Sequence, residues 1–351
     1  MPYRNAFVTG ATGLLGGYIV ETLISRGTPV RAIVRNGSDT RLLEKLDVSL
    51  TRGDLADEEF THHAIADADV VYHCAGRTTN WGPWEDFQRG NVEVTQNVAN
   101  ACQHHGVARL VHVSSIAVYG HPPLTSGLID ENASLGQNLW SHDHYNNSKI
   151  AAENTVSQLG DRATVVRPTW FYGPRDRVFI PRVVSTLRKK AAWILGKRDQ
   201  KLNGLYVTDV ADACVEAAMR DEAAGKAYNL CNHDGISQQE LFDILCEAFG
   251  CPRVRRRIPL GVARAYAHFV ETTARLKRQD SPPPISRHSL SVLSRPLIFS
   301  NQQAQRDLDW QPKVNHREGL ARTIKWIRRG SPPDETSTAT PTLTEIDGTF
   351  F

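Results

Sequence analysis

The sequence lacks several features that would assign it to common classes of protein. Its six cysteines are scattered along 351 residues without a Cys-x-x-Cys pair, so neither a disulfide framework nor a zinc site is predicted. We expect reduced thiols, no bound metal and a cytoplasmic protein. No uncharged apolar run reaches about 18 residues, so no membrane-spanning helix is predicted. The net charge is only +3, too small to indicate a nucleic-acid partner.

The chain also leaves little room for a secretory signal, because the first apolar run begins at Asn5. The composition of 40% hydrophobic and 23% charged residues is typical of a globular protein. This length is sufficient for a large hydrophobic core and for a second, smaller domain.

Strand and helix patterns alternate through the first half of the chain. Short apolar runs predict strands at 5–8, 30–34, 47–51, 69–74, 109–113 and 162–167. Helical periodicity falls between them, notably at 18–26, 88–105 and 145–159. This alternation predicts an α/β fold with a Rossmann-type, doubly wound parallel sheet, which binds ligands at the carboxyl ends of its strands.

The pattern loosens after about residue 170. We therefore predict a mainly dinucleotide-binding domain at 1–170 and a mainly substrate-binding lobe at 171–330, with the strand 227–230 returning to the main sheet. Residues 331–351 predict a disordered tail. Residues 253–278 carry eight basic residues and one acid, interpreted as a solvated helix face, with a peripheral membrane contact as the alternative.

A glycine-rich turn joins the first predicted strand to the first predicted helix. Gly10 permits the tight turn, Gly13 lets backbone approach a phosphate, and Gly16 lets helix pack on strand. Bare N–H groups at a helix N-terminus bind anions such as the pyrophosphate of a dinucleotide. The triplet alone could be an ordinary loop, and its position between strand and helix favours the cofactor. The residues predicted to bind there are Gly10, Thr12, Gly13, Leu14, Leu15 and Gly16.

The second strand indicates which nucleotide is bound. Enzymes that bind NAD place a carboxylate at its end, whereas this chain has Arg35 there, which suits the 2′-phosphate of NADP unless it is merely a surface arginine. We predict NADP as the preferred cofactor, with NAD as the alternative. Asp54 and Leu55 follow the third strand, where Asp54 is placed to bond adenine. Cys74, Ala75 and Gly76 follow the fourth strand near the ribose and diphosphate.

Two further segments carry the chemistry. Tyr145 and Lys149 are four residues apart, so on a helix they share one face. This spacing alone would also fit an exposed helix pair. Ser115 follows the fifth strand at the sheet edge where ligands bind, although a serine there could simply cap the strand.

Together these segments resemble the extended branch of the short-chain dehydrogenase/reductase family. Further matches are Asn91 after Gly90, Tyr119-Gly120, and Arg167-Pro168 continuing to Pro174. The resemblance implies Tyr145 as catalytic acid/base, Lys149 as its activator and ribose ligand, and Ser115 as the group that orients the substrate oxygen. It implies cofactor contacts of Asn91, Val113, Tyr145, Lys149 and Pro168. We expect the Lys149 cation and the nicotinamide to lower the pKa of Tyr145.

Three functions stay open at this stage. The segments 30–35 and 167–176 are similar to those of 3β-hydroxysteroid dehydrogenases and dihydroflavonol reductases, which favours an NAD(P)-dependent oxidoreductase acting on a secondary alcohol or ketone. The alternatives are a sugar-nucleotide epimerase or dehydratase and a non-catalytic NADP-binding scaffold. The partner is a small molecule, and a bulky apolar substrate is predicted to contact Trp81, Trp84, Trp140 and Trp170, unless these side chains only pack. The resemblance also implies a homodimer through the helices at 88–105 and 145–159.

Overall fold

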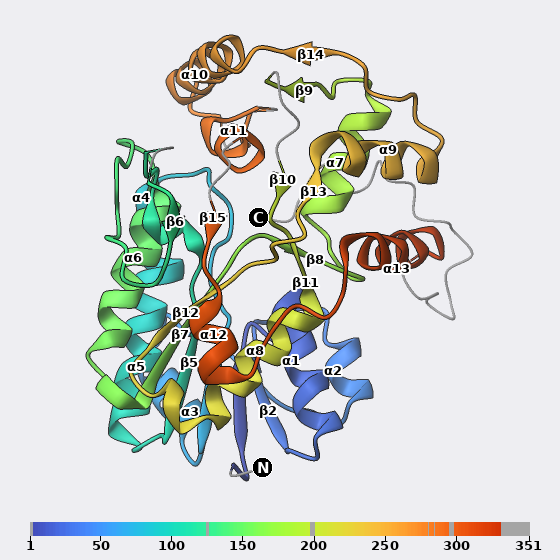
Figure 1. Ribbon diagram of the computed structural model, residues 1–351. Coiled ribbons are helices and arrows are strands. Elements are labelled where there is room, and N and C mark those ends of the chain that lie inside the picture. Colours follow the sequence, from blue (N-terminus) through green and yellow to red (C-terminus); the bar gives the residue numbers. More distant parts are fainter. Residues whose placement is uncertain are drawn as a thin grey trace. The chain divides into compact units, whose positions relative to one another are not determined.

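A computed structural model describes residues 3–123, 126–196, 201–279, 281–283, 285–294 and 298–330 (Figure 1). The predicted tail at 331–351 lies outside the described residues. The described residues form two compact units, one drawn from the ranges 3–171, 207–231 and 298–313 and the other from the ranges 172–206, 232–294 and 314–330.

The first unit is built on a seven-stranded sheet in which every neighbouring pair is parallel. The strand order is β12-β7-β5-β4-β1-β2-β3. The strands are β1 (Ala6–Thr9), β2 (Val30–Val34), β3 (Ser49–Arg52), β4 (Val70–His73), β5 (Arg109–Val113), β7 (Ala163–Pro168) and β12 (Ala227–Leu230). The order reverses between β1 and β4, and a doubly wound sheet binds its ligand at such a reversal. The predicted fold class is confirmed.

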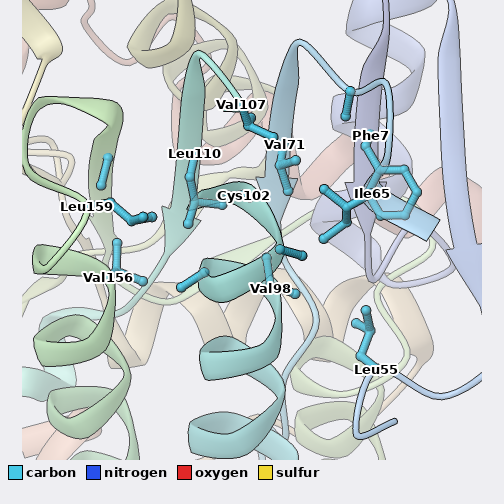
Figure 2. Packing of buried hydrophobic residues seen from close by; sticks show 14 of the residues in the cluster. Phe7, Leu55, Ile65, Val71, Val98, Cys102, Val107, Leu110, Val156 and Leu159 are labelled. Atoms are coloured by element: carbon cyan, nitrogen blue, oxygen red, sulfur yellow. The ribbon is translucent and has the colours of Figure 1, made fainter. Parts of the chain in front are cut away.

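The helices of this unit cover both faces of the sheet. α3 (Glu58–Ile65), α5 (Val94–His104) and α6 (His144–Ser157) lie on one face (Figure 1). Between them and the strands lies a cluster of buried side chains that includes Phe7, Val71, Leu110 and Val156 (Figure 2). Strands buried on both faces need a nearly continuous apolar sequence, which is why they are visible in the sequence.

The other face is covered by α1 (Leu14–Ser25) and α8 (Val207–Met219), which contact one another. α8 is not predicted from the sequence, although nine of its residues are buried. Because α8 packs on α1 and β12 pairs with β7, the first unit is discontinuous along the chain. Its remaining elements are α2 (Arg41–Lys45), α4 (Trp84–Phe87), a π-helical turn (Gln88–Glu93), β6 (Leu128–Ile129), β15 (Ile298–Phe299) and α12 (Gln302–Leu308).

The second unit consists of helices and two-stranded pairs. Its helices are α7 (Phe179–Arg188), α9 (Gln238–Phe249), α10 (Leu260–Leu276), α11 (Arg287–Ser294) and α13 (His316–Arg328). Its strand pairs join β8 (Phe171–Tyr172) with β11 (Leu205–Tyr206), β9 (Ile194–Leu195) with β14 (Arg257–Ile258), and β10 (Lys201–Leu202) with β13 (Ile236–Ser237). A small apolar cluster of Leu195, Ala263, Ala267 and Leu290 holds α10 and α11 to β9.

Two expected absences can be checked against the described residues. All six cysteines are free thiols. Within the ranges given above, no helix combines the length and apolar character needed to cross a bilayer.

Candidate active site

The glycine turn is shaped by close backbone contacts at the point where the strand order reverses. Gly10 has a φ of +66°, and a Cβ there would lie 2.7 Å from the backbone N of Ala75, which follows β4. A Cβ on Gly16 would collide with the carbonyl oxygen of Gly10. Gly13 caps α1 without a side-chain hydrogen bond, and the first turn of the helix has no acid. The turn therefore offers a positively polarised helix end that a pyrophosphate fits.

The ends of β2 and β3 carry the residues predicted to meet the adenosine. Arg35 is exposed directly after β2, and among the described residues no acid pairs with its guanidinium. Asp54 follows β3 and forms an ion pair with Arg89, with Oδ2 3.0 Å from the guanidinium. The carbonyl of Leu55 accepts hydrogen bonds from Thr61 and Asn97. Arg89 is not among the residues predicted from the sequence.

A chain of buried hydrogen bonds connects the glycine turn to the π-helical turn. The Thr9 hydroxyl lies 2.8 Å from Nδ1 of His73 and accepts from the backbone N–H groups of Cys74 and Ala75. Nε2 of His73 lies 3.0 Å from the hydroxyl of Thr95, which donates to the Asn91 carbonyl. These bonds fix the backbone after β4 next to the turn after β1.

Asn91 lies in the π-helical turn and extends this series of hydrogen bonds to α6. Its amide donates to the Ser148 hydroxyl on α6 at 2.8 Å and to the Arg77 carbonyl at 3.1 Å. Ser148 in turn donates to the Tyr145 carbonyl at 2.8 Å. Single π-turns inside helices are frequent at functional sites, and here the turn ties α6 to the segment after β4.

The structure brings Tyr145 and Ser115 together. A hydrogen bond joins their side chains, although they come from α6 and from the segment after β5. Lys149 lies one turn further along α6, and its buried ammonium donates to the Val113 carbonyl at 2.8 Å. A Cβ on Gly76 would lie 3.9 Å from that nitrogen. The phenol, the hydroxyl and the ammonium therefore share the sheet edge with the glycine turn.

The pKa values of these groups are set mainly by burial. Burial lowers the pKa of Lys149 to about 8, partly opposed by Glu153 and Cys74. Burial raises the pKa of Tyr145, partly opposed by its hydrogen bond with Ser115. Burial of Tyr145 disfavours the phenolate, and Lys149 is not among the groups that shift the pKa of Tyr145 in the protein itself. The expectation that Lys149 and a bound nicotinamide together lower this pKa stays a prediction.

A buried ion pair lies beneath the lysine, one helical turn beyond it. Nε and Nη2 of Arg167 on β7 donate to the Glu153 carboxylate at 2.6–3.2 Å, and Nη1 donates to the Tyr119 hydroxyl at 2.9 Å. Tyr119 donates to Asn229 at 2.8 Å. Glu153 is not among the residues predicted from the sequence. The signal for it is its spacing, four residues after Lys149 on one helical face.

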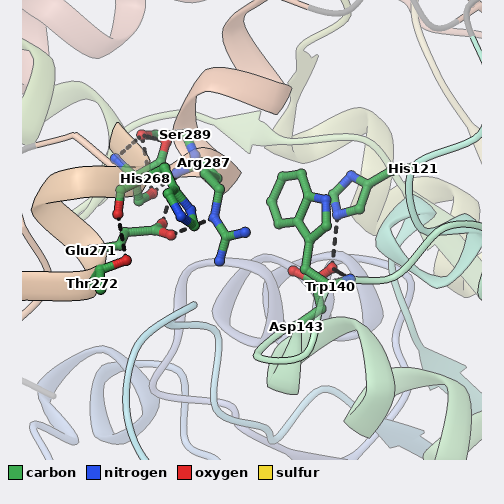
Figure 3. A network of polar contacts seen from close by, with 9 residues as sticks. His121, Trp140, Asp143, His268, Glu271, Thr272, Arg287 and Ser289 are labelled. Atoms are coloured by element: carbon green, nitrogen blue, oxygen red, sulfur yellow. Dashed lines mark hydrogen bonds and ion pairs between the residues drawn. The ribbon is translucent and has the colours of Figure 1, made fainter. Parts of the chain in front are cut away.

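The four tryptophans predicted to contact substrate have different surroundings. Trp81 is 5% exposed and belongs to the core, whereas Trp84, Trp140 and Trp170 are half-buried. Trp140 stacks on His121, with ring centroids 3.8 Å apart, and its backbone N–H donates to Asp143 at 2.7 Å (Figure 3). His121 Nε2 and Asp143 Oδ2 are 2.8 Å apart and both side chains are buried. Asp143 occupies the N-cap position of α6, two residues before Tyr145, without a side-chain cap hydrogen bond, and its contacts with Trp140 and His121 place Trp140 beside that end of the helix.

Comparison with known proteins places this arrangement in a family. The model described as "NAD dependent epimerase/dehydratase family" matches residues 6–231. The chain belongs to this family. The resemblance inferred from the sequence motifs is confirmed.

Relatives of this family member include reductases and steroid dehydrogenases. A 2-alkyl-3-oxoalkanoate reductase of Stenotrophomonas maltophilia is 33% identical over 325 residues, which cover 90% of this chain and 97% of the relative. A 3beta-hydroxysteroid-dehydrogenase/decarboxylase (isoform 2) of Arabidopsis thaliana is 28% identical over 92% of this chain and 61% of the relative. The solved structure of MoeE5 in complex with UDP-glucose and NAD has a TM-score of 0.70 at 25% identity, covering 93% of this chain and 99% of that one.

Proposed function

We propose that this protein is an NAD(P)-dependent oxidoreductase that interconverts a secondary alcohol and a ketone on a bulky, largely apolar substrate. The observation that carries the proposal is the hydrogen bond between the side chains of Tyr145 and Ser115, with buried Lys149 one helical turn away. These groups lie at the sheet edge where the glycine turn offers a pyrophosphate site. Tyr145, Lys149 and Ser115 are assigned as the catalytic residues.

Each catalytic residue has a definable task. The nicotinamide, when bound, supplies or accepts the hydride. In reduction, Ser115 holds the substrate oxygen by a hydrogen bond while Tyr145 donates its proton to that oxygen. The raised pKa of Tyr145 keeps the phenol protonated at neutral pH, as a proton donor must be. Lys149 supports the negative charge that the phenol oxygen acquires and holds the ribose.

The dinucleotide is assigned to the residues at the ends of β1, β2, β3, β4, β5 and β7. The turn at Gly10, Thr12, Gly13, Leu14, Leu15 and Gly16 takes the pyrophosphate. Asp54 and Leu55 take the adenine, the segment from Cys74 to Gly76 takes the ribose, and Asn91, Val113 and Pro168 complete the site. NADP is preferred, because exposed Arg35 provides a cation where NAD enzymes carry a carboxylate.

The substrate assignment rests on the relatives and on the half-buried aromatic side chains. A 2-alkyl-3-oxoalkanoate is a ketone that bears alkyl chains, and a 3β-hydroxysteroid is a secondary alcohol on a rigid apolar skeleton. Trp84, Trp140 and Trp170 provide apolar surface for such molecules.

A substrate panel tests the reaction class. The purified protein is incubated with NADPH or NADH and with long-chain 2-alkyl-3-oxoalkanoates, 3-ketosteroids or UDP-glucose, and the loss of reduced cofactor is followed by absorbance. We expect net oxidation of NADPH with an alkyl ketone or a steroid. Conversion of UDP-sugars without net change in cofactor would instead assign an epimerase, the function to which the UDP-glucose complex of MoeE5 points. Tight NADPH binding without turnover of any substrate would assign a scaffold.

The homodimer through α5 and α6 remains a prediction of the family resemblance. Light scattering on the purified protein, at several concentrations, measures its mass directly.

A further inference from the structure

α10 exposes large apolar side chains while packing through small ones. Eight large hydrophobic side chains are exposed in the described part of the chain, and four of them lie on this 17-residue helix. Val262 is 57% exposed, Tyr266 56%, Phe269 68% and Leu276 79%. The side chains that α10 buries are Ala263, Ala267, Glu271 and Ala274. A helix that only covered a core would bury its large apolar side chains and expose polar ones.

The four exposed side chains form one face of the helix. Their spacing from Val262 is four, seven and fourteen residues, which is the repeat of a single stripe. The buried alanines lie on the other side, where Ala263 and Ala267 contact Leu195 and Leu290. Contiguous exposed apolar surface of this kind marks an interaction site rather than ordinary surface.

The charge around the stripe has one sign. Arg255, Arg256 and Arg257 precede the helix, and Lys277 and Arg278 follow it, all exposed. The one acid of this segment, Glu271, is turned inward, where its carboxylate accepts from the backbone N–H of Arg287 at 2.7 Å and from Nε of Arg287 at 2.6 Å (Figure 3). No negative charge from residues 253–278 therefore faces outward beside the stripe.

Aromatic side chains accompany the stripe, as they do where proteins meet a lipid interface. Tyr266 combines an apolar ring with a polar tip, and such side chains are enriched at the level of the lipid headgroups. Half-exposed Trp193 precedes β9, the strand that pairs with β14, and the Arg256 guanidinium lies 5.6 Å from its ring centroid. An apolar stripe flanked by arginine and aromatic residues is the composition of a helix that lies in a membrane surface.

We propose that α10 docks in the plane of an anionic lipid surface, with Val262, Tyr266, Phe269 and Leu276 inserted between the headgroups and the flanking arginines and Lys277 on the lipid phosphates. The positive charge of these basic residues favours an anionic lipid surface as the partner, because anionic lipids attract basic residues that lie close to the membrane. The proposal does not depend on the catalytic assignment, since none of these residues is part of that site.

Vesicle co-sedimentation tests the proposal with the full chain. The protein is mixed with vesicles of phosphatidylcholine alone or of phosphatidylcholine and phosphatidylglycerol, at low and high salt. We expect binding to the anionic vesicles, little binding to the neutral ones, and weaker binding as salt rises. Tyr266→Ser with Phe269→Ser should weaken binding by at least about tenfold, and each of Arg256→Gln and Arg257→Gln by about fivefold.

A matched control uses an exposed apolar side chain of the other unit. Leu128→Ser removes a side chain that is 54% exposed on β6, and it should leave vesicle binding unchanged. Circular dichroism and the thermal midpoint confirm that each variant is folded. The NADPH oxidation assay should be equal for all variants, which separates this proposal from the proposed function.

Three results would overturn the proposal. The first is equal binding of the Tyr266→Ser, Phe269→Ser double variant and the wild type. The second is a dimer in solution that dissociates in the double variant, which would make a second copy of the chain the occupant of the stripe. The third is binding that occurs only after deletion of residues 331–351, which would make that acidic segment the occupant.

Discussion

Two buried histidines predict that the protein loses stability in mild acid. His73 on β4 and His112 on β5 are buried, with ring centroids 5.4 Å apart. Burial, reinforced by the charge of Lys149, lowers the pKa of His73 to about 3 and that of His112 well below its ordinary 6.5. Both rings are therefore neutral in the folded protein over the whole range in which the unfolded chain takes up protons.

The sign and size of the effect follow from proton linkage. The unfolded state binds more protons than the folded state below the unfolded pKa, so the free energy of unfolding falls as the pH drops below about 6.5. A histidine with a folded pKa near 3 lowers the free energy of unfolding by about 2 kcal/mol between neutral pH and about pH 5. His73 and His112 together should lower the free energy of unfolding by about 4 kcal/mol. Lys149 does not change this slope, since a lysine with a folded pKa of about 8 is charged in both states there.

Denaturant titrations at several pH values between about 7 and 5 measure the free energy of unfolding. His112→Phe keeps an aromatic ring and removes the titrating nitrogens, neither of which has a hydrogen-bond partner among the described residues, so we expect about half the acid-induced loss. Exposed His268→Gln is the matched control and should retain the full loss. A free energy of unfolding that stays constant over this range, or a full loss in His112→Phe, would refute the reasoning.

Two further substitutions test the cofactor and the support of the catalytic helix. Arg35→Asp should lower the ratio of kcat/KM for NADPH over NADH by at least about tenfold, because it replaces a charge-assisted contact with repulsion. Arg220→Gln, directly after the C-terminal end of α8, should leave the ratio unchanged. An unaltered ratio in Arg35→Asp refutes the NADP assignment. Glu153→Gln leaves Arg167 as an uncompensated buried charge and should lower the free energy of unfolding by about 3–5 kcal/mol. The loss should be smaller in the double variant that also carries Arg167→Met. Equal stability of Glu153→Gln and the wild type would contradict the structural role of the pair.

Most strands of the sheet were predictable from the sequence because they are buried on both faces, whereas the edge strand β3 is partly exposed. The predicted strands 30–34, 109–113 and 227–230 coincide with β2, β5 and β12, and the other strands differ by a residue or two at their ends. α8 was not predicted, because the polar residues Thr208, Asp209, Asp212 and Glu216 interrupt the apolar pattern of this largely buried helix. Its burial comes from packing on α1, a contact that local sequence does not encode.

The candidate site was only partly predictable for a similar reason. Motif spacing predicted that Tyr145, Lys149 and Ser115 would share one edge of the sheet. It did not predict the Glu153–Arg167 pair or the hydrogen bonds through His73 and Asn91, because those contacts join side chains of different strands and helices, which spacing within one helix does not reveal. Nor did the spacing show that burial raises the pKa of Tyr145 in the protein itself, since spacing does not reveal how deeply a side chain is buried.

The central claim is that Tyr145 transfers the proton to the substrate. The most direct measurement compares Tyr145→Phe with the wild type for turnover of the best ketone in the panel and for the Kd of NADPH. We expect a loss of turnover of roughly 10² to 10⁴ with the Kd of NADPH nearly unchanged. Tyr72→Phe, which changes a buried tyrosine on β4, should retain activity. Substantial turnover in Tyr145→Phe would contradict the claim and remove Tyr145 from the mechanism.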